Sequence, residues 1–308
     1  MPNFVHRKNV LLGCAVMLAS TLLFAVMHAI VRHLSAELHP FEVAFFRNAL
    51  ALLFFIPLIV KGSGNLLKTE HFKWHLLRAT INVGAMLMFF YALAITPLAV
   101  VQALSFTAPL FTTLMAVFLL RERVRLRRCT AIAIGFTGVL IILRPGIQPV
   151  ELGTMLVLGS ASLWALTMIV IKRLSDTDTP TPITAYLTIF LTFMSLIPAL
   201  LVWKTPIGSQ WAWLMLAAIC GTLGQLCIAK AFAFADATTV LPFDFAKIIW
   251  GAALGYLFFG EYVDIYTWIG AVVIFSGACY VAIRERQLEK EGQRIAATNS
   301  PPADEWRT

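Results

Sequence analysis

The chain has 308 residues, of which 59% are apolar and only 13% are charged, and its mean hydropathy is +0.82. Because a soluble domain carries about 25% charged residues, these proportions exclude an ordinary water-soluble enzyme, a disordered chain and a small disulfide scaffold. The net charge of +8 does not indicate a nucleic-acid partner, since the basic residues lie in short loops and tails, where they orient a membrane protein. The five cysteines are dispersed in apolar runs without C-x-x-C spacing and are expected to be free thiols.

Long uncharged runs recur along the whole chain and predict helices that cross a membrane. A helix needs about 20 apolar residues for this, and the first run, 9–31, is too long for a signal peptide. The run 79–120 is long enough for two helices, and Thr96-Pro97 divides it because a residue before proline avoids helical geometry. The ten predicted spans are 9–31, 42–60, two within 79–120, 129–143, 152–171, 183–203, 211–234, 238–259 and 265–283.

The distribution of Lys and Arg predicts which loops are cytoplasmic. With the N-terminus inside, eighteen of the 24 basic residues fall in cytoplasmic segments, and only Arg32, Arg144 and Lys204 fall in external ones. This bias is typical of a multi-pass protein of the cell inner membrane, and the even number of spans places both termini in the cytoplasm. Residues 1–9 form the predicted cytoplasmic N-terminus, and the polar residues 285–308 form a disordered cytoplasmic tail.

The two halves of the chain resemble each other. Their alignments pair 19–35 with 159–175 at an offset of 140, 119–122 with 258–261 at an offset of 139, and Gly138 with Gly277. Residues 10–144 and 152–284 are therefore predicted to form two repeats of five helices, and an odd number of spans forces the second repeat to cross in the opposite direction. Inverted repeats around a midplane site are typical of alternating-access transporters; a duplication kept only for packing is the alternative.

Several motifs carry a resemblance to a known family. Tyr91-Ala-Leu-Ala through Pro97-Leu-Ala, Leu104-Ser-Phe-Thr-Ala-Pro-Leu-Phe, Leu120-Arg-Glu-Arg and Gly135-Phe-Thr-Gly-Val-Leu-Ile-Ile resemble the first EamA repeat of the drug/metabolite transporter superfamily. Leu241-Pro-Phe-Asp, Phe259-Gly-Glu, Trp268-Ile-Gly and Gly277 resemble the second. The resemblance implies an all-α membrane protein with ten transmembrane helices, a central cavity between inverted repeats, and secondary transport of a small organic metabolite. Within the superfamily, the chain is most similar to bacterial riboflavin importers and S-adenosylmethionine uptake carriers.

Asp244 and Lys247 are the first candidates for a binding site. An ionisable side chain in mid-span costs about 2.5–3.5 kcal/mol, so its presence needs a reason. These two lie three residues apart and share a helical face with Gly251 and Gly255, which predicts that the face points into the protein. They either line the cavity and meet a polar substrate or a coupling proton, or form a structural ion pair.

Two further basic residues lie within predicted spans. His28 could take up a proton during transport, but an interfacial histidine beside Arg32 is the preferred interpretation. Arg47 could pair with an anionic substrate group, but extension of its side chain towards the membrane surface is preferred, as it is for Lys230.

Uncharged residues complete the candidate site. Gln102 and Gln225 bond either between helices or to a ligand, and Asn82 is assigned to a bond between helices. Trp250 could stack on a planar ligand, although a lipid-facing or core position is more usual for tryptophan. Pro109 is expected to kink the fourth span, either as a gate or coordination point or simply in packing.

The function expected from these observations is transport. The sequence has no H-E-x-x-H, no G-x-S-x-G, no phosphate-binding loop and no filter-like Gly-rich segment, so an intramembrane enzyme or a channel is only the alternative class. Riboflavin uptake is the best specific expectation; S-adenosylmethionine uptake and export of amino acids or other metabolites are the alternatives. No metal, cofactor or nucleic acid is expected, and the partners are the metabolite and the bilayer. Transport direction, a coupling proton or ion, and the oligomeric state are left open.

Overall fold

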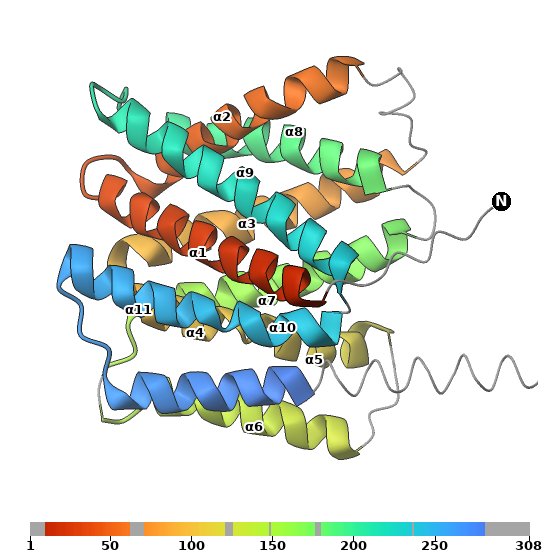
Figure 1. Cartoon of the computed structure of the whole chain (residues 1–308), viewed down its shortest axis with the longest axis vertical. Coiled ribbons are helices and arrows are strands. Elements are labelled where there is room, and N and C mark those ends of the chain that lie inside the picture. Colours follow the sequence, from red (N-terminus) through yellow and green to blue (C-terminus); the bar gives the residue numbers. More distant parts are fainter. Residues whose placement is uncertain are drawn as a thin grey trace, which may run out of the picture.

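The computed structural model describes residues 10–61, 71–120, 126–147, 149–175, 180–235 and 237–280, and almost all of them are helical. The predicted N-terminal segment 1–9 and the tail 285–308 lie outside these residues. The helices are α1 Val10–Leu34, α2 Pro40–Lys61, α3 Phe72–Ile95, α4 Leu98–Ser105, α5 Ala108–Leu120, α6 Leu126–Leu143, α7 Leu152–Ser175, α8 Pro180–Leu200, α9 Gln210–Phe234, α10 Ala237–Asp244 and α11 Ala246–Phe259, followed by an unlabelled helix at Ile265–Tyr280. They form one bundle whose members run back and forth along a common direction (Figure 1).

Two pairs of short helices each occupy one predicted span. Only Phe106 and Thr107 separate α4 from α5, and only Phe245 separates α10 from α11. Counted as pairs, these helices give ten segments in the described part of the chain, in agreement with the ten predicted spans. The stretches long and apolar enough to cross a membrane are α1, α3, Leu98–Met115, Leu152–Ile171 and α9.

The second of these breaks was not expected. The sequence predicts one continuous span over 238–259, yet Phe245 interrupts it with i to i+3 bonds from its own N–H to Pro242 and from Ile248 N–H to its carbonyl. Pro242, which lacks an N–H, lies inside α10 just before the break. The kink expected at Pro109 is not found at that residue. The helix breaks instead at Phe106 and Thr107, and Pro109 lies in the first turn of α5, where the missing backbone N–H of proline costs little.

The outside of the bundle is strongly apolar. Large apolar side chains with at least half of their surface exposed include Leu11, Leu140, Phe193, Ile197, Leu257, Phe258 and Val272. A surface of this kind is stable against lipid and unfavourable against water. The bundle therefore has the exterior of a protein embedded in a membrane.

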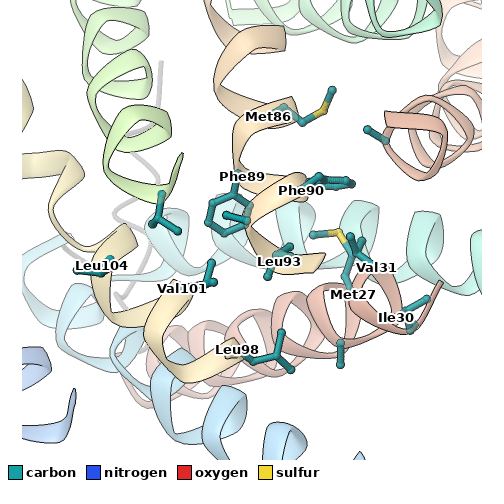
Figure 2. Close-up of a cluster of buried hydrophobic side chains, with 14 of the residues drawn as sticks. Met27, Ile30, Val31, Met86, Phe89, Phe90, Leu93, Leu98, Val101 and Leu104 are labelled. Carbon is teal, nitrogen blue, oxygen red and sulfur yellow. The ribbon is translucent and has the colours of Figure 1, made fainter. Parts of the chain in front are cut away.

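The main buried cluster lies where α1, α3 and α4 meet (Figure 2). Met27 of α1, Phe89 and Phe90 of α3, and Leu98 and Leu104 of α4 are all nearly or fully buried. Burial of such side chains contributes roughly 1.5–3 kcal/mol each where water is the reference solvent. This cluster holds the aromatic residues of α3 in place beside the cavity described below.

Most helix contacts join the first half of the chain to the second. In these contacts α1 packs on α9, and α3 packs on α7; α2 packs on α9, and α3 packs on α8. Likewise α1 packs on α10 and α11, whereas α7 packs on α4 and α5. Two further pairs, α2 with α8 and α4 with α11, complete this pattern, so the two halves meet through an extensive shared interface.

The backbones of α6 and the last helix approach each other closely at two glycines. A Cβ atom on Gly138 would lie 2.7 Å from the Gly270 carbonyl oxygen, and one on Gly270 would lie 2.6 Å from the Gly138 carbonyl oxygen. Small residues permit such contact between helices in a membrane, where close packing drives association.

Candidate functional site

A cavity of about 430 Å³ lies between the two halves of the bundle and is lined by residues of α1, α2, α3, α4, α7, α8, α9 and α11. This volume falls in the range of small-molecule sites, about 300–1,000 Å³. Lining residues fall between 78 and 90 in α3 and in the second halves of α7 and α9. The cavity therefore extends from the middle of the bundle towards the end at which α1 begins.

One wall of the cavity is aromatic. The Phe89 ring lies 5.8 Å from the Trp164 ring, tilted by 36°, and 5.1 Å from the His28 imidazole in an edge-on arrangement. Phe24 lies on the other side of His28, at 6.3 Å. Rings placed in this way present both faces and edges to a planar ligand.

His28 and Gln102 form a buried polar pair on this wall. Gln102 Nε2 lies 2.7 Å from His28 Nδ1 and joins α4 to α1, and both residues line the cavity. Because an amide nitrogen only donates, Nδ1 accepts and the ring keeps its proton on Nε2. Only 8% of the His28 surface is exposed, so its ring is buried between helices as well as being close to Arg32 in the sequence. Gln102 bonds between helices and also faces the cavity.

Asp244 and Lys247 form an ion pair across the break between α10 and α11. Asp244 Oδ1 lies 2.5 Å from Lys247 Nζ, and the two side chains are largely buried. Lys247 also lines the cavity, with Nζ 5.5 Å from the centre of the Phe24 ring. Gly251 and Gly255 are buried as predicted for this face. The geometry thus contains both the structural ion pair and a cavity-lining cation.

Arg47 lies in the cavity wall, eight residues into α2. Its Nη1 donates to Asn48 Oδ1 at 2.8 Å, and its Nη2 packs against the bare Cα of Gly221 in α9. The expected extension towards the membrane surface is therefore wrong for Arg47. Lys230, in contrast, is exposed.

The remaining predicted residues fall in different places. Gln225 and Asn82 line the cavity, so the assignment of Asn82 to helix packing alone is not supported. Trp250 donates from Nε1 to Thr21 Oγ1 at 3.2 Å and ties α11 to α1; the tryptophan of the cavity wall is Trp164. Pro109 is exposed in α5.

Sequence reasoning missed Arg78 as a cavity residue. It was assigned to a cytoplasmic segment because the uncharged run begins at residue 79, whereas α3 begins at Phe72 and carries Arg78 inside the bundle, 7% exposed. Arg78, Asn82 and Met86 recur at intervals of four and all line the cavity. This spacing places them on one helical face and is the signal that could have revealed Arg78.

The opposite end of the bundle carries an ion pair between the halves. Arg32 Nη2, at the end of α1, lies 2.5 Å from Glu261 Oε1, just after α11. Glu261 Oε2 accepts from the Leu98 N–H at 2.9 Å, and Arg32 Nη1 donates to the carbonyl oxygens of Leu93 and Thr96. Three segments are thereby joined at the end of the bundle where α1 and α11 end (Figure 1).

The two halves of the chain, residues 11–144 and 151–283, each match the model of the EamA-like transporter family. A riboflavin transporter of Vibrio cholerae is 34% identical over 297 residues, which cover 94% of this chain and 99% of the relative. An S-adenosylmethionine uptake transporter of Rickettsia prowazekii is 28% identical over 280 residues, covering 91% and 95%. A solved crystal structure at 17% identity, covering 90% of this chain and 98% of its own, shares the fold with a TM-score of 0.58. The chain therefore belongs to the EamA-like transporter family and is a multi-pass membrane transporter of a metabolite, not an enzyme.

Proposed function

We propose that this protein is a secondary active carrier in the bacterial inner membrane that takes up riboflavin by alternating access. The observation that carries the proposal is the cavity between the two halves, with its aromatic wall and its inward-facing polar groups. A planar ring system can pack on Phe89 and Trp164, while the amide groups of the cavity, such as Gln102 and Gln225, supply hydrogen bonds to its polar edge. The similarity to a riboflavin transporter over 94% of the chain supports this substrate.

The inverted relation of the repeats is part of the proposal. If α1 is exchanged with α7, α2 with α8, α3 with α9, and the α4–α5 pair with the α10–α11 pair, the main helix contacts map onto each other. The contact of α1 with α9 becomes that of α7 with α3, and the contact of α2 with α9 becomes that of α8 with α3. This exchange supports two related arrangements of similar energy, as alternating access requires.

In the proposed transport cycle, the described conformation is the inward-facing state. The cavity reaches towards the end where α1 begins, and the Arg32–Glu261 pair holds the other end shut. The excess of Lys and Arg in the segments at the first end makes it the cytoplasmic one, with both termini inside. Release into the cytoplasm then follows from opening at this end.

S-adenosylmethionine uptake is the second candidate. It is supported by the relative of that name, which matches 91% of this chain. The cavity's aromatic wall and its hydrogen-bonding groups suit an adenine ring as well as a flavin.

The proposal is tested by uptake and exchange. Expression in a riboflavin auxotroph at limiting vitamin is expected to restore growth, and proteoliposomes loaded with unlabelled riboflavin are expected to accumulate the labelled compound by counterflow. The same vesicles with S-adenosylmethionine test the second candidate. No rescue at normal membrane expression, together with no counterflow, would remove riboflavin as substrate; flux without exchange would indicate a channel.

A further inference from the structure

Arg47 is a cation inside the bundle that has no anionic partner among the described residues. It lines the cavity, and its side chain donates a hydrogen bond to the neutral side chain of Asn48. Among the described residues, the ion pairs join Arg32 to Glu261, Arg144 to Asp264 and Lys247 to Asp244, so none of them involves Arg47. The Arg47 Nε atom is buried and has no hydrogen-bond partner in the described part of the chain. A buried charge without a paired anion is costly inside a membrane protein, so its presence indicates a ligand that pairs with it.

The position of the guanidinium is built by two neighbouring residues. A Cβ atom on Gly221 would lie 2.6 Å from Arg47 Nη2, 3.1 Å from its Nε and 2.8 Å from Met27 Sδ, so a larger residue here would displace the guanidinium from its present place. On the other side, Asn48 is 4% exposed, and its Nδ2 contacts Met86 Sδ at 3.2 Å. Arg47 is thereby held in the cavity wall and kept from extending to the membrane surface.

The described residues around the cavity offer Arg47 no acidic side chain. The charged residues among those that line it are Arg47, Arg78 and Lys247, and all three are basic. Lys247 is already paired with Asp244, and His28, which interacts electrostatically with both Lys247 and Arg47, accepts its hydrogen bond from Gln102. An anionic or strongly accepting group for Arg47 is therefore one that the transported molecule can supply.

We infer that Arg47 is the specificity-determining residue of the carrier and binds a pair of acceptor atoms on the edge of the substrate. A guanidinium presents its donors in a flat fork, which matches two adjacent acceptors in one plane. In riboflavin these acceptors are the ring nitrogen and carbonyl oxygen at the pyrimidine end of the flavin, with the ring packed on the aromatic wall. In S-adenosylmethionine they are the two oxygens of the carboxylate. The inference rests on the carrier function proposed above and names the group that recognises its substrate.

Binding to the purified full-length protein in detergent tests this role. Riboflavin binding is followed by quenching of flavin fluorescence, and S-adenosylmethionine binding by equilibrium dialysis of the radiolabelled compound. Arg47→Met removes the donors and the charge, Arg47→Lys keeps the charge without the fork, and Gly221→Ala keeps the arginine but displaces it. Lys230→Met is the matched control, because it removes an exposed cation of α9 that is not part of the cavity wall.

The expected result is a rise in Kd of about ten-fold or more for Arg47→Met, as for the loss of a hydrogen bond to a charged group. Arg47→Lys and Gly221→Ala are expected to weaken binding as well, and Lys230→Met to leave it unchanged. If Arg47→Met does not fold, as judged by gel filtration, the other two variants decide the question. Binding within two-fold of wild type in the folded variants would overturn the role of Arg47 while leaving the substrate assignment intact. A wild-type protein that binds neither compound would instead refute the proposed function, and the inference with it.

Discussion

Phe106 and Phe245 occupy equivalent places in the two broken spans and contact each other, with ring centres 6.0 Å apart. They lie 139 residues apart in the sequence, the same offset that relates the C-terminal parts of the two repeats. Phe275 completes the cluster, at 6.0 Å from Phe106 and 4.4 Å from Phe245. The two helix breaks therefore face each other across the interface between the halves, next to the cavity residues Ser105 and Lys247.

Replacing these rings is expected to reveal a coupling between the repeats. Phe106→Ala and Phe245→Ala should each lower stability by about 2–3 kcal/mol, below the range for fully buried phenylalanine because both rings are half-buried. The double variant should lose about 0.5–1.5 kcal/mol less than the two single losses combined, since the ring contact is lost once. Equilibrium unfolding in detergent measures the cycle, and strict additivity would contradict the contact.

The order of the helices follows from the sequence because a bilayer imposes a length on every span. Pro97 correctly separates α3 from α4. The start of α3 at Phe72 could not be found by searching for uncharged runs, because Lys73 and Arg78 interrupt the run although the helix continues through them. A helix end rich in basic residues is compatible with the membrane surface, and hydropathy alone does not distinguish it from a loop.

The candidate site was predictable only where its residues are neighbours on one helix. The Asp244–Lys247 pair follows from the spacing of three residues. The partners of Arg47 and His28 do not, since Gly221 lies on α9 and Gln102 on α4, and nothing local in the sequence specifies how those helices approach. The roles of these residues in transport stay predictions.

Breaking the Arg32–Glu261 pair is expected to open the external end of the carrier. Arg32→Gln and Glu261→Gln each remove the attraction that joins the halves, and Glu261→Gln still leaves an oxygen for the Leu98 N–H. A cysteine placed at the cavity residue Ser105, in a background without the native cysteines, should then react several-fold faster with an impermeant thiol reagent added outside. Lys230→Gln is the control, because it removes an exposed cation of α9 that belongs neither to this ion pair nor to the cavity wall. Equal labelling of all variants would argue against the closing role.

The Asp244–Lys247 pair allows a structural role to be separated from a transport role. Asp244→Asn and Lys247→Met are each expected to abolish uptake at normal membrane expression, and each leaves one charge without its partner, which typically costs 3–5 kcal/mol at a buried pair. The double variant should recover most of that stability, since neither charge is left unpaired. If Lys247 contacts substrate, uptake should stay lost in the double variant. Recovery of uptake along with stability would assign the pair a structural role, and full activity of both single variants would exclude any role in transport.

We expect that any side chain at Gly138 would disturb the contact between α6 and the last helix. Gly138→Ala puts a methyl group 2.7 Å from a backbone oxygen, so the helices must separate at a cost of about 1–3 kcal/mol. Gly84→Ala is a matched control, because its Cβ would meet its nearest neighbour, Leu163 Cδ1, at 3.4 Å. Alanine has a higher helix propensity than glycine, and this gain applies to Gly138→Ala and Gly84→Ala alike. A lower thermal midpoint for Gly138→Ala but not for Gly84→Ala would therefore identify the close contact. Equal midpoints for the two variants would mean that the helices can adjust.

Acid is expected to weaken the start of the last helix through Asp264. Partial burial opposes ionisation of this carboxyl, but hydrogen bonds from the Thr267 hydroxyl and backbone N–H and the Arg144 guanidinium together hold its pKa below the usual 3.8. A carboxyl with a lowered pKa in the folded state adds stability above its unfolded pKa and loses it as the pH falls through the folded value. The wild type should therefore melt higher than Asp264→Ala at pH 7, and the difference should shrink below about pH 4. Asp264→Asn keeps an N-cap for Thr267 but lacks the charge, so its midpoint should lie between the two at pH 7, and its difference from Asp264→Ala should not change with pH. A difference between wild type and Asp264→Ala that does not change from pH 7 to pH 3 would show that the ionised carboxylate contributes nothing at this helix end.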